Sequence, residues 1–273
     1  MSNLRKEIQA YYNQDQERTR LQSSRGQLEQ TRTEQLLARF LPSPPAIIVD
    51  VGGATGVYAF PLASQGYQVH LIDPMPLHIK HVERKAKMQL QYPLMSVTLG
   101  DASRIPMDDA EADAVLLFGP LYHLTNRLDR VQALREAYRV LKPKGVVFAA
   151  GISRFASLLD GLAQGFITDP QFLRIIQQDL HDGQHRNPTE NPQYFTTAFF
   201  HNPDELKREV EEAGFDATLL CAVEGPIWMA SSFDQYWENR ILRQQLLSLL
   251  DIVENEPSLL GASAHLLAIS FKP

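Results

Sequence analysis

The clearest chemistry in the sequence lies in a glycine-rich segment that directly follows a buried apolar run. Residues 47–56, IIVDVGGATG, pass from an expected strand into a tight turn and then into an expected helix. Glycines in such a turn let the backbone approach a ligand closely, and the first turn of the helix offers unpaired amides to it. The segment therefore predicts a ligand-binding loop.

Two common phosphate-binding patterns do not fit this loop. The dinucleotide pattern G-x-G-x-x-G fails because Ala54 stands two residues after Gly52, and the next glycine after Gly56 is Gly66. A Walker loop fails because no Gly-Lys-Ser/Thr follows. What remains is Asp50 followed by small residues at alternate positions, which disfavours a nicotinamide-dependent oxidoreductase.

Acidic residues follow the next two expected strands. Asp73 ends the apolar run 68–72, roughly twenty residues after the glycine loop, and Asp101 follows the run 95–99. In a doubly wound sheet, the carboxyl ends of successive strands converge on one crevice, where a carboxylate can accept hydrogen bonds from ribose hydroxyls. Each aspartate alone could equally cap a helix. The prediction therefore depends on the fact that both occupy the same position, directly after an expected strand.

Together these features resemble motif I and the following acidic positions of the class I S-adenosylmethionine-dependent methyltransferases. Ala54 stands where that family usually has its middle glycine. The segments 118–123, 134–145 and 260–265 look like a bacterial, small-molecule-type subgroup, so the resemblance covers nearly the whole chain. It implies a methyltransferase enzyme with S-adenosyl-L-methionine as its cofactor.

The resemblance also implies which residues contact the cofactor. Motif I would shape the site for the methionine end, Asp73 would bind the ribose and Asp101 the adenine. The predicted cofactor-binding residues are Asp50, Gly52, Gly53, Ala54, Gly56, Asp73, Pro74, Asp101, Ala102 and Phe118.

Residues 119–123 follow the fourth expected strand, from which this fold usually presents groups to the methyl group and its acceptor. Tyr122 and His123 are the predicted catalytic residues, with His123 as a candidate general base because imidazole titrates near neutral pH. Alternatively, His123 only packs at the start of a helix, since alignment alone can drive methyl transfer. The predicted substrate-binding residues are Tyr12, Arg20, Tyr122, Arg154, His201 and Glu224.

The sequence predicts no metal site. His181 and His185 are spaced for one face of a helix, but Gly183 lies between them and no H-E-x-x-H pattern is present. Cys221 is the only cysteine, which excludes an intramolecular disulfide and a thiolate zinc cluster.

The alternation of short apolar runs with helical patterns predicts an α/β fold with a doubly wound, mostly parallel seven-stranded sheet. The expected strands are 47–51, 68–72, 95–99, 114–118, 146–150, 216–223 and 265–271, and the last two could pair antiparallel at the sheet edge. The main expected helices are 57–64, 78–90, 128–141, 203–213 and 233–254. Residues 1–45 would form an N-terminal helical lid, and residues 46–273 a methyltransferase domain with an inserted helical cap at about 153–202.

Composition narrows the class of acceptor. The 273 residues are 44% hydrophobic and carry 26 basic and 32 acidic side chains, a net charge of 26 − 32 = −6. This balance excludes wholesale disorder and disfavours nucleic acid, and no apolar run suggests a membrane span or a secretory signal. We therefore expect a cytoplasmic enzyme that methylates a small molecule by in-line displacement. An RNA or protein methyltransferase and a non-catalytic S-adenosylmethionine-binding protein stay open as alternatives, as does a homodimer.

Overall fold

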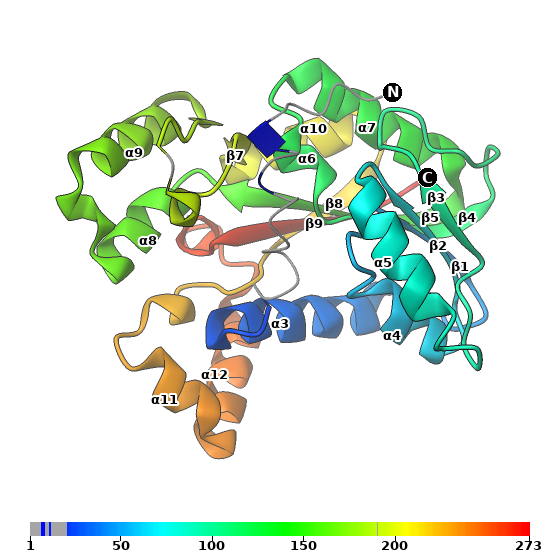
Figure 1. Ribbon diagram of the computed structural model, residues 1–273, viewed down its shortest axis with the longest axis horizontal. Coiled ribbons are helices and arrows are strands. Elements are labelled where there is room, and N and C mark those ends of the chain that lie inside the picture. The colour runs from blue at the N-terminus through cyan, green and yellow to red at the C-terminus, as the bar shows by residue number, and fades with distance from the viewer. Residues whose placement is uncertain (1–6, 9–10, 12–20, 190) are drawn as a thin grey trace.

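The structure, a computed structural model, describes residues 7–8, 11, 21–189 and 191–273 of the chain. A twisted central sheet carries helices on both faces (Figure 1). Within the described residues, no helix is both long enough and apolar enough to cross a membrane.

All seven expected strands form, and they pair in the order β3-β2-β1-β4-β5-β9-β8. Their bounds are β1 Ile47–Val51, β2 Gln68–Asp73, β3 Ser96–Leu99, β4 Ala112–Leu117, β5 Leu141–Ser153, β8 Asp216–Ala222 and β9 His265–Phe271. The first five run parallel, whereas β9 is antiparallel to both β5 and β8. The mostly parallel fold and the antiparallel pairing of the last two strands are thus confirmed.

Alternate residues of the buried strands face two separate cores. In β1, Val49 and Val51 belong to one apolar cluster and Ile48 to the other, as the period of two along a strand requires. The first core lies under α7 (Arg127–Val140) and α10 (Pro203–Glu212). The second lies under the helices of the opposite face, α3 Ser24–Phe40, α4 Ala59–Ser64 and α5 Pro76–Ala86.

β5 begins earlier than expected. The sequence predicts a strand at 146–150, after a helix that Pro143 and Gly145 stop, but α7 already ends at Val140 and β5 starts at Leu141. The register between β4 and β5 shifts in this region, and Lys144 has a positive φ of 67°. Such an irregularity lets a strand accommodate a proline, which cannot donate a ladder hydrogen bond.

The insertion after β5 contains more than helices. It consists of α8 Ala156–Gln164, η1 Phe166–Thr168, α9 Pro170–Asp182, β6 Gln184–His185, η2 Pro192–Tyr194 and β7 Ala198–His201. Ile152 of β5 pairs with Phe200 of β7 on one side and with His265 of β9 on the other, so β7 lies beyond the end of β4. The cap, residues 153–202, therefore extends the sheet by two short strands.

The single helix expected at 233–254 is two helices, α11 (Phe233–Glu238) and α12 (Arg240–Val253). Asn239 separates them because its side-chain oxygen accepts the amides of Ile241 at 3.0 Å and Leu242 at 3.2 Å, which begins a new helix. Both helices pack on α3 rather than on the sheet (Figure 1).

Candidate functional site

A cavity of about 690 Å³ lies where the parallel strands end. Its walls come from the turns after β1, β2, β3 and β4, from α3 and from the start of β9. The predicted site residues that line it are Asp50, Gly52, Gly53, Ala54, Asp73, Pro74, Asp101, Ala102, Phe118, Tyr122 and His123. Most of the predicted cofactor set therefore lies around one space.

The glycine loop after β1 uses left-handed backbone at alternate residues. Gly52 and Gly56 each have a φ of 75° and Ala54 a φ of 46°. A side chain at position 52 would place its Cβ 2.9 Å from Cδ of Pro120, so Gly52 lets the loop pack against the segment after β4. Gly56 does not line the cavity, and a Cβ there would lie 2.8 Å from the Phe60 ring.

Asp73 ties two loops together at the end of β2. Its Oδ2 accepts the backbone N–H of Ala54 at 2.9 Å, and its Oδ1 accepts the N–H of Met75 at 2.8 Å. His78 Nδ1 lies 3.0 Å from the same Oδ1. A carboxylate offers about four lone-pair positions, so Oδ2 keeps one for a ligand hydroxyl.

Asp50 presents a buried carboxyl group to the same cavity. It is 1% exposed, and among the described residues its Oδ2 has no hydrogen-bond partner. Burial, with a smaller contribution from the charge of Asp73, raises the pKa of Asp50 to about 7. A carboxyl group in this state is suited to a cationic ligand group, which would favour its ionised form.

Asp101 begins the turn after β3. Its Oδ1 accepts the backbone N–H of Ser103 at 2.8 Å and also the Ser103 hydroxyl. The aspartate is only partly buried and lines the cavity together with Ala102 and Ser103. This turn closes the side of the cavity that lies next to β3.

The short helix α6 (Pro120–His123) follows β4 and brings two aromatic side chains to the cavity. The rings of Tyr122 and His123 meet edge to face with centroids 4.7 Å apart. Phe195 of the cap packs behind them, with ring centroids 6.5 Å from Tyr122 and 6.0 Å from His123. Phe195 itself does not line the cavity. The cap therefore supports this wall from behind.

Arg154 and His201, expected to bind substrate, do not line the cavity. Both are buried and join the cap to the sheet and to α10. Arg154 donates to the Phe200 carbonyl at 2.8 Å and to Glu205 at 2.6 Å, and His201 lies 3.3 Å from Glu209. Tyr12 and Arg20, also in the predicted substrate set, lie outside the described residues.

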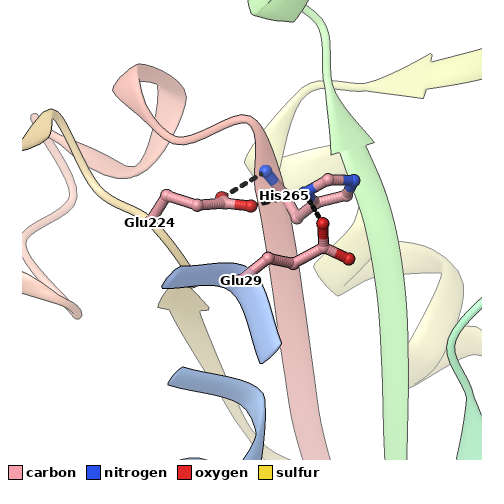
Figure 2. Close-up of side chains that lie close together, drawn as sticks. All are labelled: Glu29, Glu224 and His265. Atoms are coloured by element: carbon pink, nitrogen blue, oxygen red, sulfur yellow. Dashed lines mark hydrogen bonds and ion pairs between the residues drawn. The ribbon is translucent and has the colours of Figure 1, made fainter. Parts of the chain in front are cut away.

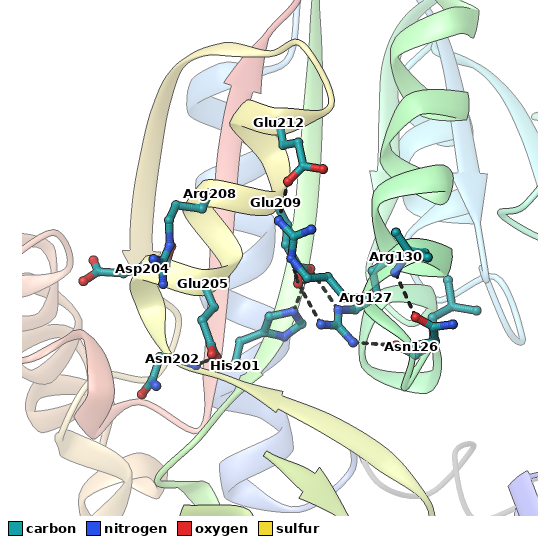
Figure 3. A network of polar contacts seen from close by, with 12 residues as sticks. Asn126, Arg127, Arg130, His201, Asn202, Asp204, Glu205, Arg208, Glu209 and Glu212 are labelled. Atoms are coloured by element: carbon teal, nitrogen blue, oxygen red, sulfur yellow. Dashed lines mark hydrogen bonds and ion pairs between the residues drawn. The ribbon is translucent and has the colours of Figure 1, made fainter. Parts of the chain in front are cut away.

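Glu209 is the centre of a buried polar network (Figure 3). Arg130 of α7 donates to both of its oxygens, at 2.9 and 2.7 Å, and His201 contacts it from β7. Burial alone would raise the pKa of Glu209, but the hydrogen bonds from His201 and Arg130 outweigh burial and lower it to about 2. Burial lowers the pKa of His201, because it disfavours the protonated, charged form of the ring.

His181 and His185 do not form a pair. α9 ends at Asp182, and Gly183 adopts a left-handed conformation, so His185 lies beyond the helix. His185 is buried and bonds to Asp179 and to the Tyr194 carbonyl, both at 2.8 Å, whereas the side chain of His181 is 80% exposed.

A second polar cluster, not assembled by the sequence analysis, consists of Glu29, Glu224 and His265 (Figure 2). His265 Nδ1 lies 2.6 Å from Glu224 Oε1 and 3.9 Å from Glu29 Oε2. Glu29 and His265 line the cavity, whereas Glu224 is buried behind them. Glu29 and Thr33 are four residues apart on α3, so they share one face of that helix, and both line the cavity. This spacing is the sequence feature that could have indicated a role for Glu29.

Both oxygens of Glu224 are occupied. Oε2 accepts the Ser263 hydroxyl and the His265 backbone N–H, both at 2.8 Å, and Oε1 faces the His265 ring. Burial would raise the pKa of Glu224, but the charge and hydrogen bonds of His265, with help from Ser263, lower it. Glu224 is therefore a carboxylate that orients the ring of His265.

The chain is similar to known methyltransferases in both sequence and fold. Residues 49–149 match a family model described as a methyltransferase domain. The ubiquinone/menaquinone biosynthesis C-methyltransferase UbiE of Caulobacter sp. is 36% identical over 206 residues, covering 70% of this chain and 75% of that protein. The protein of the same name from Caulobacter vibrioides is 34% identical over 149 residues, covering 52% and 56%, so the match spans little more than half of that relative's length.

Solved structures share the fold at low sequence identity. A SAM-dependent methyltransferase from Methanosarcina mazei has a TM-score of 0.58 and 17% identity, covering 87% of this chain and 96% of that one. A Thermotoga maritima SAM-dependent methyltransferase, described as a "possible histamine N-methyltransferase", has a TM-score of 0.57 and 16% identity, covering 97% and 98%. Phosphoethanolamine N-methyltransferase 2 of Haemonchus contortus, solved with S-adenosyl-L-methionine, has a TM-score of 0.56 and 16% identity, covering 89% and 52%.

Proposed function

Because the chain belongs to the class I S-adenosylmethionine-dependent methyltransferases, we propose that it transfers the cofactor's methyl group to a small organic acceptor. The observation that carries the proposal is that one cavity combines the turns after β1, β2 and β3 with α3, α6 and β9 in its walls. A ligand held in the loops would therefore share an enclosed space with a second, smaller molecule.

The residues present fit the cofactor. Asp50, with its buried Oδ2 that has no hydrogen-bond partner among the described residues, matches the cationic methionine end, and Gly52 and Gly53 line the cavity beside it. Asp73 has lone-pair capacity for a ribose hydroxyl, and Asp101 lies at the next strand end for the adenine amino group. When bound, S-adenosylmethionine supplies a methyl group already activated by its sulfonium.

The protein's own contribution to the reaction is then alignment. Tyr122 and His123 form a rigid aromatic wall, because α6 begins with Pro120 and Phe195 packs behind the two rings. Holding an acceptor atom in line with the methyl group can supply several kcal/mol of the barrier reduction. We assign this positioning to Tyr122 and His123, with His123 as a candidate general base.

A small acceptor is favoured over RNA or protein. The net charge is −6, and the described lining of the cavity contains no lysine or arginine to hold phosphates. Two relatives are named as C-methyltransferases of ubiquinone and menaquinone biosynthesis. That name indicates that those relatives act on small molecules.

A parallel titration tests the cofactor. S-adenosylmethionine and S-adenosylhomocysteine should each raise the melting temperature, by about 5 °C or more at a hundredfold excess over Kd, whereas NAD should not. Failure of both sulfur nucleosides to bind the folded protein would overturn the proposal.

A second measurement separates an enzyme from a silent binding protein. Radiolabelled methyl should pass from S-adenosylmethionine into a filtered low-molecular-weight cell extract, and Tyr122→Ala should reduce that transfer at least tenfold with cofactor affinity nearly unchanged. Label transferred equally well by the variant, or no label transferred by the parent chain, would contradict the catalytic assignment.

A further inference from the structure

Four apolar side chains are exposed on the segment that joins α5 to β3. Met88 is 82% exposed, Leu90 80%, Met95 55% and Tyr92 45%. The backbone of this segment is held in place, because turns continue from the end of α5 and the N–H of Met95 donates to the Val69 carbonyl of β2 at 2.8 Å. Apolar side chains grouped in this way on a surface indicate an interaction site.

The outer face of α5 carries cations next to this apolar segment. Lys80, Arg84 and Lys87 are spaced so that they share one face of the helix, and all three are exposed. Among the described residues, none of the three forms an ion pair. Lys85 is not part of this face, because its amine lies over the Phe60 ring, 4.2 Å from the ring centre. The charged face therefore ends where the apolar segment begins.

The local charge has the opposite sign to that of the whole chain. Residues 80–95 contain four basic side chains and one acidic side chain, Glu83, a net charge of 4 − 1 = +3 with histidine neutral. The chain as a whole has a net charge of −6. A basic patch on an acidic protein attracts an anionic partner at short range, since salt screens the more distant charges.

We propose that this surface, residues 80–95, docks the protein on an anionic lipid bilayer. The four apolar side chains enter the layer between headgroups and acyl chains, and Lys80, Arg84 and Lys87 contact the lipid phosphates. The two contributions act together, because a short apolar segment alone binds weakly and cations alone are screened by salt. The inference goes beyond the proposed methyl transfer and does not depend on it.

Two other occupants fit this surface less well. A second copy of the chain would bring the same positive charge against it, which is unfavourable. A nucleic acid would neutralise the cations but leave Met88 and Leu90 in water. An anionic bilayer satisfies both the charged and the apolar part of the surface.

The apolar segment lies at the opposite end of β3 from the cavity. It precedes β3, whose 4 residues separate it from Asp101 and the cavity wall. In the described part of the chain, β3 is the last strand on its side of the sheet, so no further strand covers the segment there. Docking through this surface therefore does not cover the cavity, and vesicles should leave the affinity for S-adenosylhomocysteine unchanged.

Sedimentation with lipid vesicles tests the proposal. The parent chain should bind phosphatidylcholine vesicles that contain about a third phosphatidylglycerol at least about tenfold more tightly than pure phosphatidylcholine vesicles. Raising the salt from about 0.1 M to about 0.5 M should weaken that binding about tenfold. The variant Lys80→Gln/Arg84→Gln/Lys87→Gln should weaken it by at least about thirtyfold, since each cation near the surface contributes about fivefold.

The apolar part is tested separately. Met88→Ser/Leu90→Ser should weaken vesicle binding about tenfold without changing the charge. The matched apolar control is Leu249→Ser/Ile252→Ser, which changes two exposed side chains of α12. The matched charge control removes three exposed arginines of other helices, and it is Arg174→Gln/Arg208→Gln/Arg240→Gln. Both controls should bind vesicles as the parent chain does.

Several results would overturn the proposal. These are equal binding to neutral and anionic vesicles, a loss of binding in either control as large as in its matched variant, or no vesicle binding together with self-association or RNA binding that requires Lys80, Arg84 and Lys87. All variants should keep the parent melting temperature, which shows that a loss of binding does not come from unfolding. Failure of S-adenosylhomocysteine to bind would contradict the proposed function and leave the vesicle result unaffected.

Discussion

The Oδ2 atom of Asp73 accepts the backbone N–H of Ala54 at 2.9 Å, so the acidic residue that ends β2 fixes the loop that follows β1. The contact joins two walls of the cavity through one carboxylate. Any ligand that bonds to Asp73 is thereby placed against the glycine loop. A change at Asp73 should therefore affect both stability and cofactor binding.

Asp73→Asn tests this double role. The amide has one acceptor oxygen in place of two, so at least one of the bonds to Ala54, Met75 and His78 is lost. We expect the free energy of unfolding to fall by about 1–3 kcal/mol and the affinity for S-adenosylhomocysteine to fall at least tenfold. Urea unfolding and calorimetry measure the two effects. Asp108→Asn, on an exposed turn, should change neither.

Ala54→Gly should leave the protein as stable or make it more stable. The left-handed conformation of Ala54, with φ of 46°, costs an L-residue about 1 kcal/mol that glycine avoids, although glycine loses more entropy on folding. The melting temperature should rise or stay level, and cofactor affinity should stay within about twofold. Ala38→Gly, in the exposed part of α3, should by contrast lose about 1 kcal/mol; a similar loss at position 54 would show that the backbone there is not strained.

The raised pKa of Asp50 predicts an unusual pH dependence. Its folded-state pKa of about 7 lies above the ordinary 3.8, so the folded protein holds this proton longer than the unfolded chain. The contribution of Asp50 to stability is therefore greatest below pH 4 and is lost as pH rises towards 7, by at most about 1.4 kcal/mol per pH unit. The difference in unfolding free energy between the parent chain and Asp50→Asn should show this slope.

Cofactor binding should have the opposite pH trend. A cationic ligand group favours ionised Asp50, so S-adenosylhomocysteine should bind more tightly at pH 8 than at pH 6 and release a proton near pH 7. Calorimetry in two buffers of different ionisation enthalpy detects that proton. A parent chain that releases no more protons than Asp50→Asn would contradict the assignment.

Glu209→Ala should destabilise the fold by about 3–5 kcal/mol, because it leaves the buried charge of Arg130 without its partner. Since neither residue lines the cavity, cofactor affinity per folded molecule should be unchanged. Urea unfolding measures the loss. Glu212→Ala, which breaks an exposed pair with Arg127, is the control and should cost at most about 1 kcal/mol.

The depressed pKa of Glu209 adds an acid limit to this contribution. Because the folded-state pKa of about 2 lies below the ordinary 4.5, the stabilisation by ionised Glu209 is present above pH 4.5 and is lost as pH falls towards 2. The parent chain and Glu209→Ala should therefore converge in stability at low pH. A constant difference between them down to pH 2 would rule this out.

The elements that position the cofactor loops could be predicted from the sequence because their signals are local. Apolar runs bounded by Gly52 or Asp73 define the strands, and the carboxyl ends of parallel strands converge by topology alone. The break at Asn239 was missed because the apolar periodicity continues through it, while one side chain redirects the hydrogen bonds of the next turn.

The acceptor side could be predicted less well, because residue type does not determine which way a side chain points. Arg154 and His201 are types that occur both in substrate sites and in buried ion pairs, and the structure places them in the second group. Glu29 and His265 are far apart in sequence and meet only because α3 covers the start of β9. That contact is tertiary and has no local signature.

The position of β9 has a consequence for the order in which the protein can assemble during synthesis. Residues 265–271 lie between β5 and β8, so a growing chain that lacks them leaves the β5 edge unpaired and the cavity without one wall. Such an edge can pair with other chains, and the long-range pairing that closes it is slow to form. Until β9 has been made, the edge of β5 is therefore open to pairing with other chains, and the cavity lacks the wall formed by His265 and Leu267.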